Sequence, residues 1–90
     1  MSAKAEIGWS RTTSEGVKID VYARHVGKKW KIFWRERRFD QWQEYKAPPV
    51  EDWLELLDSV DRRIARLLLR PEEAPTLRKH IKELFPEADV

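Results

Sequence analysis

The chain has 90 residues and a mass of 10.8 kDa, which is the size of one small domain. Hydrophobic residues make up 41% and charged residues 38%, a composition typical of a folded domain rather than a disordered or membrane-embedded segment. The chain has no cysteine, which excludes disulfides, thiolate metal sites and cysteine nucleophiles.

The formal net charge of +2 is unevenly distributed along the chain. Residues 1–47 carry eleven basic and six acidic side chains, whereas residues 48–90 carry seven basic and ten acidic ones. The positive half favours a negatively charged partner, although Lys and Arg on exposed strands also deter aggregation.

We expect neither a secretory signal nor a transmembrane helix. The first residues contain no apolar run, and nowhere do about 18 apolar residues follow one another. The sequence therefore predicts a cytoplasmic protein with no membrane partner.

Strands are expected over residues 5–12, 17–25 and 29–37, and a short fourth strand over 41–46 is the least regular of the set. Apolar and polar side chains alternate strictly in the second and third strands. This alternation is the pattern of half-buried strands.

The two central strands can be paired from the sequence. A type II′ turn needs glycine at its first central position, and Gly27-Lys28 meets this requirement. The resulting register pairs Tyr22 with Phe33 and Asp20 with Arg35 on one face, which are favourable aromatic and opposite-charge pairs. The other face is then apolar, with Val17, Ile19, Val21, Ala23, Trp30, Ile32 and Trp34 directed inward.

Helical sequence begins after a break at residues 46–49. Apolar side chains at helical spacing predict a first helix over 49–70, with Pro49 in its first turn and Pro71 after its end. A second, shorter helix is expected over 75–85.

The predicted fold class is α+β, in which a three- or four-stranded antiparallel β-meander is followed by two C-terminal helices packed on one face of the sheet. Residues 1–90 are expected to form a single domain, because neither half is large enough for its own core. Trp30, Trp34 and Trp53 are expected in that core. In the order of its elements alone, the chain resembles the single-stranded DNA-binding coactivator and PUR-type domains.

Catalysis and cofactor binding are disfavoured. Glycines occur only at positions 8, 16 and 27, so neither a phosphate-binding loop nor a dinucleotide fingerprint is present. His25 and His80 are the only histidines, which is too few for a transition-metal site. We therefore expect no enzyme activity, no cofactor and no metal.

Charged side chains of the helices have structural interpretations. Asp61 within the first helix and His80 in the second would form an acid–base dyad only if they were in contact. A hydrogen bond between the two helices accounts for both residues without a catalytic role. The arginines at positions 62, 63, 66 and 70 favour a solvated face with i,i+4 ion pairs over phosphate contacts.

The outer face of the sheet carries the candidate binding site, because aromatic rings lie there among cations. Such rings stack on bases of any identity, and the cations contact backbone phosphates. The predicted nucleic-acid-binding residues are Tyr22, Arg24, Lys29, Lys31, Phe33, Arg35 and Arg37.

The function predicted from these residues is a small non-catalytic module that binds single-stranded nucleic acid. The alternative is a protein-interaction or homodimerising module, because exposed paired aromatics also mark protein contacts. A solvated face, whose aromatic pair only supports the hairpin, is the commoner arrangement in antiparallel sheets and stays open.

Overall fold

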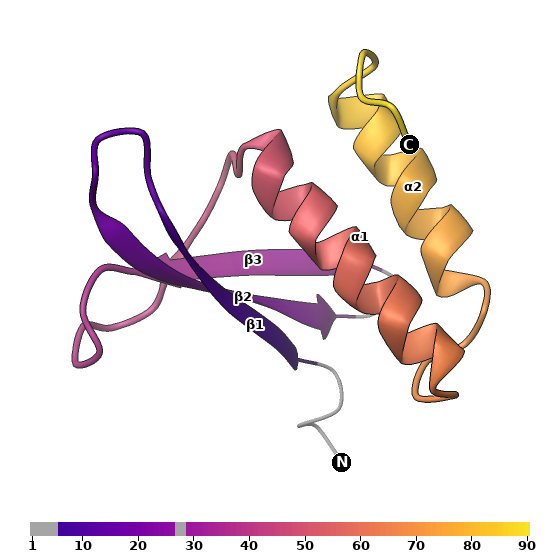
Figure 1. Ribbon diagram of the computed structural model, residues 1–90, viewed down its shortest axis with the longest axis horizontal. Helices are drawn as coiled ribbons and strands as arrows, with labels where there is room; N and C mark the ends of the chain where they lie inside the picture. The colour runs from indigo at the N-terminus through magenta and orange to yellow at the C-terminus, as the bar shows by residue number, and fades with distance from the viewer. Residues whose placement is uncertain (1–5, 27–28) are drawn as a thin grey trace. The chain divides into compact units, whose positions relative to one another are not determined.

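The computed structural model describes residues 6–26 and 29–90 of the chain (Figure 1). The elements in chain order are β1 (Glu6–Thr12), β2 (Lys18–Val26), β3 (Lys29–Arg35), β4 (Gln43–Glu44), α1 (Val50–Ala65) and α2 (Glu73–Leu84). The strands form one antiparallel sheet in the order β1-β2-β3-β4. This confirms the α+β class and the meander followed by two helices, and the fourth strand is present.

The chain divides into two compact units, residues 1–47 with the sheet and residues 48–90 with the helices. The division lies within the break expected at 46–49, and it is also the place where the charge excess changes sign. That residues 1–90 form a single domain, and that the helices pack on one face of the sheet, stay predictions.

The register of β2 and β3 agrees with the prediction at every pair. Tyr22 lies opposite Phe33, Asp20 opposite Arg35 and Val21 opposite Trp34. The Gly27-Lys28 turn from which this register was inferred lies outside the described residues.

The two faces of the sheet differ in burial. The buried side chains, each at most 3% exposed, all lie on the predicted apolar face: Ile7, Ile19, Val21, Ala23 and Ile32. The strands therefore bury one face by alternation, as expected for an amphipathic sheet.

The prediction that Trp30 and Trp34 belong to the core is wrong, because both are only half-buried. Each stands one residue from an end of β3, where fewer neighbouring side chains surround a large ring. Trp30 instead packs beside His25, with ring centroids 4.7 Å apart, and Trp34 lies 6.0 Å from Tyr45.

Two strands are shorter than expected, because a turn intervenes between them. β3 ends at Arg35 rather than at residue 37, and β4 is only two residues long. In the turn, the Asp40 amide donates to the Arg37 carbonyl at 2.9 Å, and the Arg37 amide donates to the Asp40 carboxylate at 3.2 Å. These bonds replace the ladder bonds that would have extended β3.

The helical unit consists of α1 and α2 lying side by side (Figure 1). Trp53 is 5% exposed, which confirms its core position, and its ring meets His80 of α2 edge-on at 5.2 Å. The other buried apolar residues of the two helices are Leu56, Leu57, Val60, Ala74, Leu77 and Ile81. Their three- and four-residue spacing is that of amphipathic helices.

The first helix ends five residues before its predicted end, at Ala65. The Leu68 amide donates to the Arg63 carbonyl at 2.8 Å and the Leu67 amide to the Ile64 carbonyl at 2.9 Å, which is a Schellman motif. Because Pro71 disfavours helical geometry at the residue before it, the helix cannot continue through position 70. Leu67 and Leu68 are consequently exposed, although their spacing matches the apolar stripe.

The starts of both helices differ slightly from expectation. Pro49 caps α1 with extended backbone instead of lying in its first turn. α2 begins at Glu73, two residues early, because Pro75 is accepted in the first turn, where its missing amide is not needed.

We predict that Leu67→Gly stabilises the protein. Leu67 has φ of 62° and is 91% exposed, so glycine removes left-handed strain without loss of packing. The strain of about 1–2 kcal/mol exceeds the extra unfolded-state entropy of glycine, so we expect a gain of about 0.5–1 kcal/mol in the free energy of unfolding. Urea denaturation measures it, and Leu67→Ala, which keeps Cβ, should give no gain. A loss on Leu67→Gly would contradict the prediction.

Candidate functional site

The Tyr22 face is the sheet face formed by even-numbered residues of β1 and β2 and odd-numbered residues of β3. Cross-strand pairing brings Tyr22 opposite Phe33 and Arg24 opposite Lys31, and Lys29 and Arg35 share the face. Of the seven predicted site residues, Arg37 alone lies beyond the strands, in the turn after β3.

Three aromatic rings meet on the Tyr22 face. Tyr22 and Phe33 stack, with ring centroids 5.0 Å apart and planes 16° apart. Trp42, which precedes β4, approaches Tyr22 edge-on at 4.6 Å. Tyr22 and Phe33 are half-buried and Trp42 is 36% exposed, so the cluster is partly open to solvent.

Trp42 is a site residue that the sequence analysis missed. Gln43 pairs with Trp34, which carries Trp42 to the level of Arg35 on the Tyr22 face. Only the register of β4 reveals this position, because residues 41–46 do not alternate regularly between apolar and polar side chains.

A chain of polar contacts crosses the sheet and positions Trp42. Ser10 donates its hydroxyl to the Asp20 carboxylate at 2.9 Å, and Arg35 donates Nε to the same carboxylate at 3.4 Å. The Arg35 guanidinium then lies 4.2 Å from the centroid of the Trp42 ring, a cation–π contact. One contact network thus joins β1, β2 and β3 to the residue that precedes β4.

The arginines and lysines of the Tyr22 face have different surroundings. Arg24 Nε lies 3.3 Å from the Glu6 carboxylate, which offsets the repulsion between Arg24 and the opposite Lys31. Arg35 is held by Asp20. Lys29 and Lys31 are exposed. The acidic residues of the Tyr22 face therefore cancel part of the positive charge that was expected there from the sequence.

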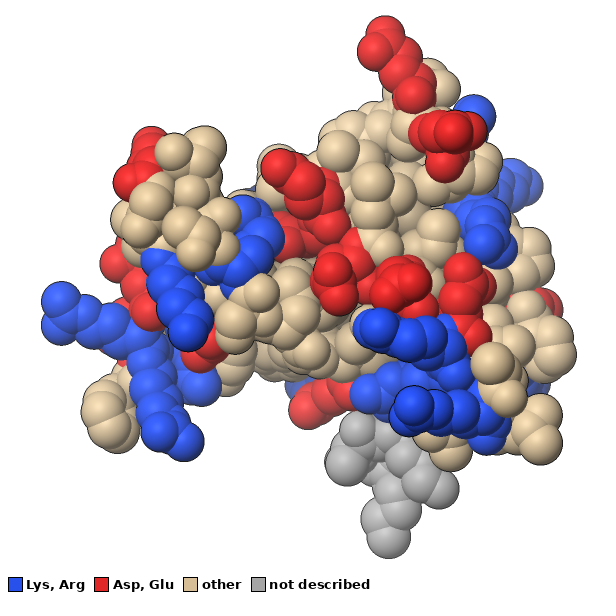
Figure 2. Space-filling view, in the orientation of Figure 1, with Lys and Arg blue, Asp and Glu red and all other residues tan. Residues whose placement is uncertain are grey.

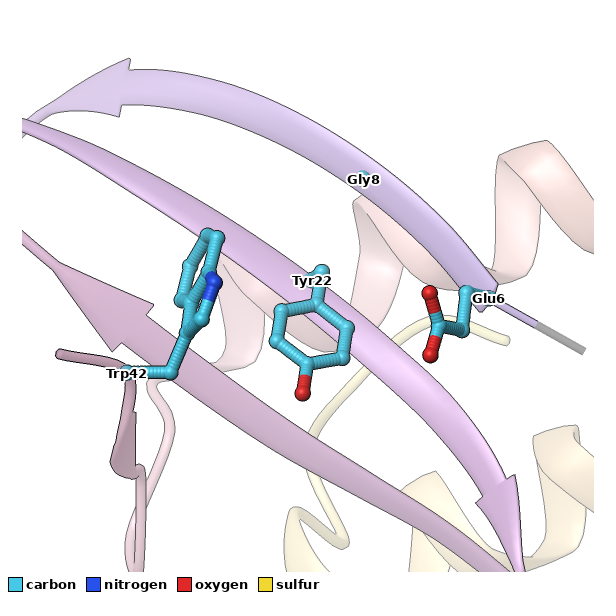
Figure 3. Close-up of a pocket in the computed structure, with 4 residues that line it drawn as sticks. All are labelled: Glu6, Gly8, Tyr22 and Trp42. Atoms are coloured by element: carbon cyan, nitrogen blue, oxygen red, sulfur yellow. The ribbon is translucent and has the colours of Figure 1, made fainter. Parts of the chain in front are cut away.

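A hollow of about 490 Å³ lies on this face, lined by Glu6, Gly8, Tyr22 and Trp42 (Figure 3). Tyr22 stands between Trp42 and the Glu6 carboxylate, and Gly8 lies opposite it on β1. A Cβ at Gly8 would come no closer than 3.6 Å to the Val21 carbonyl, so the space exists because a side chain is missing. The volume is in the range of about 300–1,000 Å³ that small-ligand sites occupy.

The turn after β3 presents a second missed residue. Phe39 is 94% exposed, and the exposed Arg37 and Arg38 precede it. Figure 2 shows basic side chains gathered around this turn. An exposed large aromatic residue beside cations is a contact feature, and no pattern in the sequence pointed to it.

The helical unit gives Asp61 and His80 different partners. Asp61 accepts a hydrogen bond from Arg78 at 3.0 Å, and the His80 ring packs on Trp53, so no acid–base dyad is formed. Arg62 pairs with Asp58 at 3.2 Å, in the i,i+4 arrangement of a solvated face.

Two features are absent from residues 6–26 and 29–90. Neither helix is long and apolar enough to cross a membrane. No group of three or more His, Asp or Glu side chains has the arrangement needed to hold a metal ion.

The comparisons with known proteins leave the chain without a family assignment: no family model, no curated protein and no solved structure matches it.

We predict that Asp20 makes stability depend on pH in the acid range. The hydrogen bond from Ser10 and the Arg35 guanidinium hold the pKa of Asp20 below its usual 3.8. A lowered pKa means that the stabilisation is complete above pH 3.8 and is lost as the pH falls below that value.

The test is the free energy of unfolding by urea, measured as the pH is lowered. Asp20→Asn should be less stable at neutral pH and should lose less stability on acidification than the parent. Ser10→Ala keeps the carboxylate and should give an intermediate slope. Equal slopes for all three proteins would contradict the assignment to Asp20.

Proposed function

We propose that the protein is a non-catalytic module that binds single-stranded nucleic acid through the Tyr22 face. The observation that carries the proposal is the Tyr22–Phe33 stack beside the exposed Lys29 and Lys31. Unpaired bases stack on aromatic rings, whereas lysines attract the phosphate backbone. Both components are present on one face, in neighbouring strands.

The basic residues have separate roles in this proposal. Arg24 and Arg35 are already paired with carboxylates, so they shape the surface more than they attract a polyanion. Lys29 and Lys31 supply most of the electrostatic attraction. Arg37, in the exposed turn, contacts phosphate at the edge of the site.

The proposal predicts salt-dependent binding of labelled single-stranded oligonucleotides, measured by fluorescence anisotropy. Affinity should be micromolar and fall as salt rises from about 50 to 200 mM. Phe33→Leu should weaken binding about fivefold or more, because stacking contributes about 1–3 kcal/mol per base. Lys31→Glu should weaken binding and reduce the dependence of affinity on salt.

Two matched controls belong to this experiment. Trp30→Leu removes a ring from the same strand but from the opposite face, and Lys79→Glu reverses a charge in α2. Both should leave affinity within about twofold, with folding checked by circular dichroism. Absence of binding at low salt would refute the proposal, and so would equal losses in the controls.

Phe39 extends the proposed surface, and we predict that Phe39→Ala lowers affinity without changing stability. The ring is 94% exposed, so its removal costs no packing, whereas a lost base stack should weaken binding about threefold to tenfold. Anisotropy and urea denaturation measure the two quantities. Leu67→Ala, at a side chain that is 91% exposed in the helical unit, is the matched control. Unchanged affinity for Phe39→Ala would exclude the turn from the surface.

The protein-interaction alternative stays a prediction, and the exposed Leu67 and Leu68 are the features that favour it. Sedimentation equilibrium tests its homodimer form. A mass that rises with concentration would support self-association, and a constant mass of 10.8 kDa would exclude it.

A further inference from the structure

We propose that the hollow beside Tyr22 receives one unpaired base and that Glu6 selects a base with an exocyclic amino group over uracil or thymine. This inference rests on the proposed function, because it assigns base selectivity to part of the same face. It concerns four residues whose positions in the sheet are defined by pairing and ring contacts: Glu6, Gly8, Tyr22 and Trp42.

The hollow offers a flat ring one aromatic wall to stack on and a second wall that meets its edge. Aromatic side chains provide two of its walls, and the edge-on contact of Trp42 with Tyr22 sets those walls nearly perpendicular, at 79°. At Gly8 no side chain occupies the space opposite Tyr22. A base can therefore enter beside the rings without moving the backbone.

The Glu6 carboxylate gives the hollow its chemical selectivity. An ionised carboxylate only accepts hydrogen bonds, so it favours the N4 amino group of cytosine and disfavours the O4 carbonyl of uracil. Arg24 Nε lies 3.3 Å from the Oε2 atom of Glu6, so Oε1 is the oxygen that the proposal assigns to the incoming amino group. The Arg24–Glu6 pair thus acts as a positioned acceptor at the end of the hollow.

A cationic ligand such as a methylated amine fits this hollow less well than a neutral base. Arg24 already lies 3.3 Å from the Glu6 carboxylate, and Arg35 already lies 4.2 Å from the Trp42 ring. These are the groups that would attract a cation, and a third positive charge would be repelled by both arginines. A neutral base meets no such repulsion, and its attached phosphate is attracted.

The test compares labelled oligocytidylate and oligouridylate of equal length at neutral pH, by anisotropy at low salt. These two bases have the same size and differ at the edge that Glu6 would read. We expect the cytosine oligomer to bind about fivefold to tenfold tighter, since one good base contact contributes about 1–3 kcal/mol. In an NMR titration, the Gly8 amide should shift with the cytosine oligomer, and the Gly16 amide, in the β1–β2 turn, should not.

Three variants locate the selectivity. Glu6→Gln, whose amide both donates and accepts, should bring the ratio of the two affinities close to one. Gly8→Leu should fill the hollow and remove the preference, and Gly8→Ala should have a partial effect. Glu15→Gln, a carboxylate in the β1–β2 turn, should leave the ratio unchanged.

The outcomes separate the two proposals. Equal affinity of the parent protein for both oligomers would overturn the selectivity inference and leave the proposed function standing. A cytosine preference that persists in Glu6→Gln and Gly8→Leu would place selectivity elsewhere and would also overturn the inference. No binding of either oligomer would overturn both.

Discussion

The register between β2 and β3 is the constraint on which the rest of the sheet unit depends. Side chains alternate along a strand, so a shift of β2 by one residue would exchange its two faces and expose Val21 in place of Tyr22. The same pairing that buries Val21 also places Phe33 against Tyr22 and Arg35 against Asp20. Core and candidate site are therefore two results of a single alignment, and neither could be changed without the other.

The parts of the fold that were predicted correctly depend on short-range patterns. The alternation of apolar and polar side chains, together with a two-residue turn, was enough to place Phe33 beside Tyr22. The end of α1 was not predictable in this way, because the apolar spacing continues through Leu67, where the positive φ and the Schellman hydrogen bonds end the helix before Pro71 is reached. Trp42 was missed for a further reason: β4 is two residues long, and its register is determined by pairing with β3 rather than by its own sequence.

The two kinds of basic residue on the Tyr22 face are used as their chemistry suggests. The planar guanidinium groups of Arg24 and Arg35 lie against carboxylates, and that of Arg35 also lies against an aromatic ring, contacts that a fork-shaped cation makes well. The compact ammonium groups of Lys29 and Lys31 are exposed. A charge count along the sequence cannot distinguish these roles, because the role of each basic residue depends on the side chains of the strand that lies opposite it.

Under the proposal, Gly8 separates base selectivity from folding. It is an ordinary strand residue whose backbone any amino acid could adopt, and the nearest atoms to a Cβ there would be at normal contact distance. Position 8 can therefore be substituted without loss of strand pairing. Alanine, serine or valine at this position would each leave a hollow of a different size. Under the proposal, one substitution at position 8 would change the ligand that the sheet binds and would leave the architecture the same.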